Sequence, residues 1–399
     1  MFAARGIVGK NPMDLFSLPA VFMRGGTSRA VVFRDGDLPP ARAERDRIFL
    51  EVMGSPDPNG RQLDGMGGGL SSLSKVCVLG PPSRDDADVD YTFAQIPIRG
   101  TSVDYSGNCG NMSSAMGPAA VDFGMVQAPA DGEAVVRIHN TNTGKIIRSR
   151  FPMSGGAPAA AGDMAINGVA GRSAPVRLEF LSPGGSRTGR LLPTGRAVET
   201  LDLPDGSRIE ASLVDAANPC VFAAAADLGL TGAELPEALE ARPDLLARME
   251  AIRCAASVRM GIAPDPAAAA TIPGVPKVAM VAAPQGATTL SGQAMGAADM
   301  SLMVRMISMG QPHRAVPVTG AICLAVAARL PGSLPARLCG AAAGPITVAH
   351  PSGSTVVDAE IAHAEDPARA EALSGAVYRT ARKLFSGQVF YRMTAETAP

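Results

Sequence analysis

The sequence predicts an α+β protein of two domains with similar layouts. Its 399 residues exceed one typical domain, and 46% of them are hydrophobic, which is enough for two cores. Each half mixes strand-like runs with one alanine-rich helix that begins at a glycine turn. The best linker by composition is 182–186, so we expect domains at 14–183 and 187–399, with the option that the last strand returns to the first domain.

The first half is expected to begin with a loosely ordered extension over residues 1–13. A helix is predicted over 41–53 from the spacing of Ile48, Leu50 and Met53. A second helix is predicted after Cys109, interrupted at Gly117-Pro118 and ending near Gly124. Strands are predicted at 21–23, 30–33, 74–79, 91–98, 135–138 and 146–147, the last two as a hairpin.

The second half repeats this mixture. A helical stretch over 235–259 is predicted to be interrupted at Pro243, and another helix is predicted over 299–309. The central helix of this half is expected to open at Thr319-Gly320 and to end at Leu330. Strands are predicted at 207–214, 220–224 and 278–282.

Charge and composition exclude several classes of protein. The net charge is −1 and there is no long basic stripe, so neither nucleic acid nor an anionic membrane surface is an expected partner. The six cysteines are scattered, which is typical of a reducing compartment, and no signal or membrane-spanning stretch is present, so we expect a cytoplasmic protein. The four histidines are far apart, and no metal or other cofactor is expected.

The run 106–111, Ser-Gly-Asn-Cys-Gly-Asn, carries the strongest chemical signal. It places Cys109 where a glycine-flanked turn opens into a helix of small residues. Backbone N–H groups and the helix dipole at such a point favour a thiolate and attract carboxylates. The segment thus outlines a proton-transfer site, although an inert buried cysteine is the alternative that the motif leaves open by itself.

Glycine-rich turns and one isolated lysine precede this thiol. The turns are 24–28, Arg-Gly-Gly-Thr-Ser, and 63–68, Leu-Asp-Gly-Met-Gly-Gly, and Lys75 follows them. Plain structural turns and a solvent-exposed lysine at a strand end are the alternatives. In the second half, Thr319 could serve only as an N-cap, and His350 and Ser352 could simply form a turn. Asn140 and Asn142 could reach a site or accept a positive φ.

Several motifs of this chain resemble those of one family. They are Asp64-Gly65-Met66-Gly67-Gly68, Ser74-Lys75, Gly107-Asn108-Cys109-Gly110-Asn111 and His350-Pro351-Ser352-Gly353, together with the turn at 24–28. It is the family of 2-methylaconitate cis-trans isomerase, with 3-methylitaconate delta-isomerase and 4-oxalomesaconate tautomerase, and the resemblance covers nearly the whole chain. It implies a diaminopimelate epimerase-like fold, in which each of two pseudo-symmetric domains wraps a mixed sheet around a central helix. It also implies that Lys75 and Cys109 are the acid-base pair.

The expected site is a cleft between the two domains. Family members commonly carry lysine where this chain has Arg29, which keeps the charge but changes reach and hydrogen-bond geometry. The candidate substrate-binding residues are Thr27, Ser28, Met66, Gly67, Gly68, Asn108, Gly110, Asn111, Asn142, Thr319, Gly320, His350 and Ser352.

The expected reaction is a shift of a C=C bond by allylic proton transfer in an unsaturated di- or tricarboxylate, without a cofactor. The resemblance is greatest to 3-methylitaconate delta-isomerase and 2-methylaconitate isomerase, and 4-oxalomesaconate tautomerase and aconitate isomerase are the alternatives. An amino-acid racemase would need a second thiol where Thr319-Gly320 stands, because Cys323 lies a full turn further into the helix and is expected in the core. A non-catalytic carboxylate-binding protein is the alternative of a different class. A homodimer is the default oligomer.

Overall fold

The computed structural model describes residues 15–105, 108–308, 310–340 and 344–392, and its contacts divide the chain into two compact units. The first unit contains residues up to Leu178 together with the chain from Arg379 onward, and the second contains Glu179–Tyr378. The chain therefore leaves the first unit a few residues before the predicted linker at 182–186. The predicted N-terminal extension, residues 1–13, lies outside the described residues.

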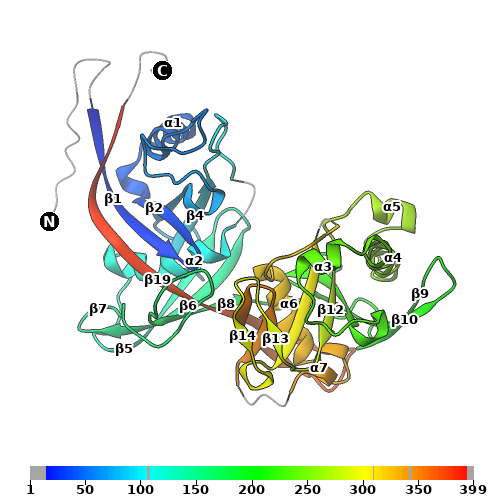
Figure 1. The fold of residues 1–399 in the computed structure, drawn as a ribbon. Helices are drawn as coiled ribbons and strands as arrows, with labels where there is room; N and C mark the ends of the chain where they lie inside the picture. Colours follow the sequence, from blue (N-terminus) through cyan, green and yellow to red (C-terminus); the bar gives the residue numbers. More distant parts are fainter. Residues whose placement is uncertain (1–14, 106–107, 309, 341–343, 393–399) are drawn as a thin grey trace. The chain divides into compact units, whose positions relative to one another are not determined.

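The first unit surrounds helix α2 with strands. Its strands are β1 (Leu15–Gly25), β2 (Ser28–Arg34), β3 (Lys75–Gly80), β4 (Val89–Gln95), β5 (Gly132–Asn140), β6 (Lys145–Ser154), β7 (Ala157–Pro158), the start of β8 (Pro175–Leu181) and the end of β19 (Glu371–Arg392). Its helices are α1 (Arg42–Met53) and α2 (Gly110–Asp122), with 3-10 turns η1 (Asp35–Asp37) and η2 (Ser71–Leu73). β19 lies antiparallel to β1 in this unit, as the red and blue strands of Figure 1 show.

The second unit surrounds helix α6 in the same way. Its strands are β9 (Glu199–Asp202), β10 (Arg208–Ala216), β11 (Asn218–Ala224), β12 (Lys277–Ala282), β13 (Ala287–Thr288), β14 (Ala294–Met295), β15 (Leu302–Ser308), β16 (Gln311–Pro312), β17 (Ile346–His350) and β18 (Gly353–Ala362). Its helices are α3 (Pro236–Glu240), α4 (Pro243–Arg259), α5 (Pro266–Ala270), α6 (Val318–Ala328) and α7 (Leu334–Leu338), with 3-10 turns η3 (Ala226–Leu228) and η4 (Ala297–Asp299). No described helix is long and apolar enough to cross a membrane.

Both central helices are buried all round, and both sheets are mixed. Every residue of α2 from Met112 to Ala120 is buried, as is every residue of α6 from Gly320 to Ala327. Small alanine, glycine and serine side chains let strands approach such a helix from several sides. β2 and β3 pair in parallel and β3 and β4 antiparallel in the first unit, and β11, β12 and β15 show the same mixture in the second. The predicted α+β class is confirmed.

The helix predicted over 299–309 is wrong. Residues from Leu302 form strand β15, which pairs with β12 and β17, while Met309 lies outside the described residues. Asp299, which looked like a helix start, instead accepts a hydrogen bond from the Gly296 N–H at 2.7 Å in η4. A segment that is buried on both faces shows no alternation of hydrophobic and polar residues that could distinguish a strand from a helix. This segment is a strand because it pairs with neighbouring strands on both sides.

The predicted interruption of α2 at Gly117-Pro118 is also wrong, because the helix continues to Asp122. Gly117 has a packing role instead. A β-carbon there would lie 2.6 Å from Oγ of Ser149 and 2.8 Å from the ring of Phe151, both on β6. The glycine therefore lets the helix and the strand approach each other closely.

Candidate active site

Lys75 is the first residue of β3, and its side chain is buried, with 7% of the residue exposed. The antiparallel register of β3 and β4 places it directly opposite Gln95. Nζ donates a hydrogen bond to Oε1 of Gln95 and lies 5.1 Å from the centre of the Phe93 ring. The alternative of a solvent-exposed lysine is therefore wrong at this position.

Cys109 occupies the N-cap position of α2 and is half-buried. The Cys109 carbonyl accepts a hydrogen bond from the Ser113 N–H at 2.9 Å. The N–H groups of Gly110, Asn111 and Met112 precede this bond, at the positive end of the helix dipole. The thiol thus lies next to backbone donors of the kind that bind an anion, at the residue where the sequence predicts the helix to open.

Cys77 connects the surroundings of Lys75 and Cys109. It lies two residues after Lys75 on the same face of β3, is completely buried, and its sulfur is 3.7 Å from the hydroxyl of Tyr91. Burial raises the pKa of the Cys77 thiol, and smaller effects come from Cys109, which raises it, and Lys75, which lowers it. One thiol is therefore within electrostatic range of both residues, which the first unit brings to the same region.

The turn between β1 and β2 packs on the first turn of α2. A β-carbon on Gly25 would lie 2.6 Å from the backbone oxygen of Asn111. Oγ1 of Thr27 accepts a hydrogen bond from Nδ2 of Asn111 at 3.1 Å, and Ser28 follows as a buried residue. Thr27, Ser28 and Asn111, which are separate motifs in the sequence, thus lie together at the start of α2.

Arg379 adds a positive charge to this group. Its Nε donates to Oδ1 of Asn111 at 3.3 Å, and burial lowers the pKa of its guanidinium to about 10, which leaves it protonated at neutral pH. No motif marks this arginine in the sequence, because it follows Asn111 by 268 residues and arrives on β19.

Asn108 is held from two sides. Its Oδ1 accepts from Nδ2 of Asn140 at 3.1 Å and from Oγ of Ser113 at 3.4 Å. Asn142 bonds to the backbone N–H and carbonyl of Phe93, both at 2.8 Å, and to the carbonyl of Tyr105 at 2.8 Å. Its amide is thus engaged with the main chain around the site. Neither Asn140 nor Asn142 has a positive φ, so the alternative that they serve to adopt a positive φ in a turn is wrong.

The glycine loop 63–69 is built around the buried amide of Gln62. Its Oε1 accepts the N–H of Gly69 at 3.0 Å and the hydroxyl of Ser74 at 2.5 Å, next to Lys75. The N–H groups of Met66 and Gly67 donate to the carbonyls of Val52 and Met53 at 2.8 and 3.3 Å. These two N–H groups are therefore bonded within the first unit, and the assignment of Met66, Gly67 and Gly68 to substrate binding stays a prediction.

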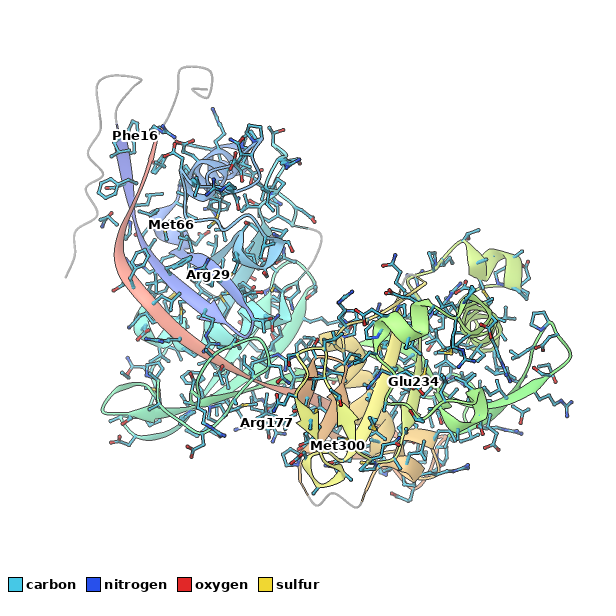
Figure 2. The ribbon with its side chains drawn as sticks, viewed as in Figure 1. Phe16, Arg29, Met66, Arg177, Glu234 and Met300 are labelled. Atoms are coloured by element: carbon cyan, nitrogen blue, oxygen red, sulfur yellow. The ribbon has the colours of Figure 1, made fainter. Side chains whose placement is uncertain are left out.

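Arg29 lies beside this loop. Its Nη2 is 3.2 Å from the position that a β-carbon on Gly68 would take, and its guanidinium carbon is 5.5 Å from the centre of the Phe22 ring. Figure 2 shows Arg29 and Met66 in the same part of the first unit. Nε of Arg29 is buried and has no hydrogen-bond partner among the described residues. Arg29 therefore places a cation beside the glycine loop.

The predicted site residues of the second unit lie at one helix start and one turn. Thr319 and Gly320 are in the first turn of α6, and the N-cap is Pro317, so Thr319 is not a cap. A β-carbon on Gly320 would lie 2.7 Å from the sulfur of Met306.

His350 is the last residue of β17, and Ser352 lies in the turn that leads to β18. Nε2 of His350 shares a hydrogen bond with Oγ1 of Thr355 at 3.1 Å, and Oγ of Ser352 donates to the carbonyl of Arg314 at 2.6 Å. Cys323 is fully buried and donates to the carbonyl of Val214 at 3.3 Å, as expected for a core thiol. The predicted cleft between the domains stays a prediction.

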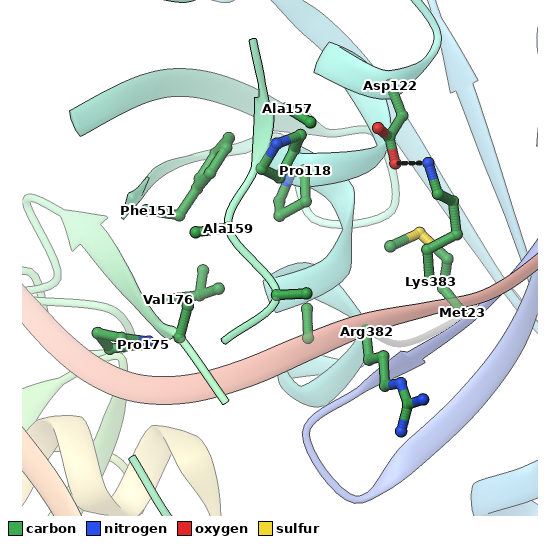
Figure 3. A pocket seen from close by; sticks show the side chains of 14 residues that line it. Met23, Pro118, Asp122, Phe151, Ala157, Ala159, Pro175, Val176, Arg382 and Lys383 are labelled. Atoms are coloured by element: carbon green, nitrogen blue, oxygen red, sulfur yellow. Dashed lines mark ion pairs between the residues drawn. The ribbon is translucent and has the colours of Figure 1, made fainter. Parts of the chain in front are cut away.

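A pocket of about 270 Å³ lies elsewhere in the first unit (Figure 3). Apolar residues such as Phe151, Pro118 and Val176 line it, and an ion pair of 2.9 Å joins Lys383 to Asp122 at its edge. It contains none of the predicted site residues. Among the described residues, no group of three or more histidine, cysteine or acidic side chains is arranged to hold a metal.

Sequence and structure comparisons identify the family. The model of the PrpF protein family matches residues 15–392. The chain belongs to this family. It is 37% identical to a 3-methylitaconate isomerase of Eubacterium barkeri, over 94% of this chain and 98% of that one. It is 40% identical to a 2-methyl-aconitate isomerase of Cupriavidus necator, over 86% and 89%.

A crystal structure of a methylitaconate-delta-isomerase shares the fold, with a TM-score of 0.88 and 36% identity over 97% of this chain and 98% of that one. The predicted resemblance is confirmed. The predicted enzyme class, an isomerase, is confirmed as well, since PrpF-family relatives carry that name.

Proposed function

We propose that this PrpF-family protein shifts a C=C bond along an unsaturated di- or tricarboxylate, with Lys75 and Cys109 as the acid-base pair. The observation that carries the proposal is that buried Cys77, on the same face of β3 as Lys75, lies within electrostatic range both of that amine and of the thiol at the N-cap position of α2. The names of the relatives favour methylitaconate or methylaconitate as the substrate.

The reaction needs one proton removed and one returned. One member of the pair takes a proton from the carbon next to a carboxylate, and the C–H electron pair spreads over the allylic system as a dienolate. The other member delivers a proton to the far carbon of that system, so the double bond moves and the proton count is unchanged. An amine and a thiol can each both take up and give up a proton, as general acid-base catalysis requires.

The dienolate carries extra negative charge on its carboxylate oxygens. The first-turn N–H groups of α2 and the guanidinium of Arg379 beside Asn111 supply positive potential near Cys109. One well-placed donor of this kind is worth on the order of 3 kcal/mol of transition-state stabilisation. We assign substrate carboxylate binding to this group together with Thr27 and Asn111.

We also propose that the protein is a homodimer in the cytoplasm.

The test is a panel of unsaturated di- and tricarboxylates incubated with the protein in D2O and followed by NMR. We expect the double bond to move in at least one compound, and we expect deuterium at the carbon that gains the proton. Thermal stabilisation by a compound without deuterium uptake would instead indicate a carboxylate-binding protein. An oxalomesaconate-type compound belongs in the panel, because a 4-oxalomesaconate tautomerase of Pseudomonas putida is 36% identical.

A further inference from the structure

Gln95 is the residue that contacts the amine of Lys75. The two residues lie opposite each other in the antiparallel ladder of β3 and β4, and Nζ of Lys75 donates to Oε1 of Gln95. Side chains directly opposite in such a ladder project from the same face of the sheet. The pairing is therefore set by the backbone register and does not depend on a loop.

The orientation of the Gln95 amide is determined by its own neighbours. Its Nε2 donates to the carbonyl of Ser74 at 2.9 Å and to the carbonyl of Ser71 at 3.0 Å. Carbonyl oxygens only accept and an amide nitrogen only donates, so rotating the amide by half a turn would break these bonds and turn an N–H group towards the lysine. The oxygen must therefore face Nζ.

The chemical nature of this acceptor matters for a lysine that must gain and lose a proton. Among the described residues, no carboxylate forms an ion pair with Nζ. Cys77 lies within electrostatic range of Lys75, and Tyr91 and Cys109 lie within range of Cys77. A neutral amide oxygen accepts an N–H from either the ammonium or the amine. The Gln95 oxygen can therefore hold Nζ of Lys75 both as the ammonium and as the amine. It adds no negative charge that would favour the ammonium.

We propose that Gln95 is a positioning residue for Lys75: it fixes Nζ in one place through the whole proton cycle and keeps the amine form accessible. This inference rests on the proposed function, because it assigns Gln95 to the proton transfer that Lys75 performs. The other N–H and the lone pair of the Lys75 amine, which do not contact Gln95, are then left for the substrate.

The experiment measures kcat and KM against pH for the wild type and for Gln95→Glu and Gln95→Leu. A carboxylate beside Nζ stabilises the ammonium, so we expect the midpoint of the activity profile of Gln95→Glu to move to higher pH by about one unit or more. Loss of the acceptor around a buried amine favours the neutral form, so the midpoint of Gln95→Leu moves to lower pH. Each kcat at pH 7 falls at least 10-fold, and each KM stays within about 3-fold.

The matched control is Gln388→Glu, which makes the same charge change at an exposed residue of β19. It should keep the wild-type profile. Unfolding temperatures show whether each variant is folded. Midpoints that stay at the wild-type pH in both folded Gln95 variants would overturn the positioning role, while a wild type that moves no double bond in any compound of the panel would overturn the proposed function itself.

Discussion

The side-chain amide of Asn111 fills the space that a β-carbon on Gly26 would need. Gly26 also has a φ of +52°, a conformation that residues with a β-carbon rarely adopt. Two independent constraints thus require glycine at this turn, which brings Thr27 to the first turn of α2.

Gly26→Ala tests this relationship. We expect a loss of about 2–4 kcal/mol in the free energy of unfolding, from the strained φ together with displacement of Asn111, and a lower kcat/KM. The control is Gly124→Ala, where φ is +68° but no atom lies within 4 Å of the added carbon. That variant should lose about 1 kcal/mol in urea unfolding. Equal losses in the two variants would contradict a role for Asn111.

Lys75→Met should abolish the isomerisation without unfolding the protein. Methionine keeps most of the buried volume and replaces a buried polar nitrogen by an apolar thioether, so the unfolding temperature should not fall, while kcat drops at least about 100-fold. Deuterium uptake in D2O is the measurement. Lys383→Met, at an exposed lysine paired with Asp122, is the control and should exchange like the wild type. Normal exchange in Lys75→Met would remove lysine from the mechanism.

The thiols should differ in reactivity. Burial raises the pKa of Cys77 and also that of the half-buried Cys339, so both are mainly protonated at pH 8 and react slowly. Cys109 lies at the positive end of α2 and should be alkylated by iodoacetamide first, with loss of activity. Peptide mass spectrometry follows each site. Labelling of Cys339 before Cys109 would count against an activated thiol.

Cys109→Ser separates the catalytic role of the thiol from its labelling. A serine hydroxyl ionises far less readily than a thiol, so proton transfer at this position should nearly stop while the helix start is preserved. Deuterium exchange into the substrate at the wild-type rate would exclude Cys109 from the chemistry.

Arg379→Met should weaken substrate binding more than catalytic turnover. The guanidinium is protonated at pH 7 and lies against Asn111, so its removal takes away positive charge where we place a carboxylate, and KM should rise about 10-fold or more. Arg382→Met, three residues further along β19 at an exposed position by the apolar pocket of Figure 3, is the control. Equal changes in both variants would indicate a general effect of charge.

Local signals determined much of the fold. The Gly-Gly turn between β1 and β2, the helix that opens after Cys109 and the hairpin of β5 and β6 lie where the sequence predicts them, because a turn or a cap is specified by residues that are neighbours in the chain. Strand β15 could not be distinguished from a helix in this way. Arg305 within it is buried and donates to the carbonyl of Glu234 at 2.6 Å, a partner 71 residues away.

The sequence by itself therefore determined which residues are chemically able to act, Lys75 and Cys109 above all, and which short segments present them. Only the tertiary structure decided that Gln95 faces Lys75, that Arg379 reaches Asn111, and that the N–H groups of Met66 and Gly67 are already bonded. The physical reason is that strand register and helix packing are set by the burial of apolar surface over the whole chain. Contacts between residues that are distant in the sequence follow from this packing, so no local sequence pattern predicts them.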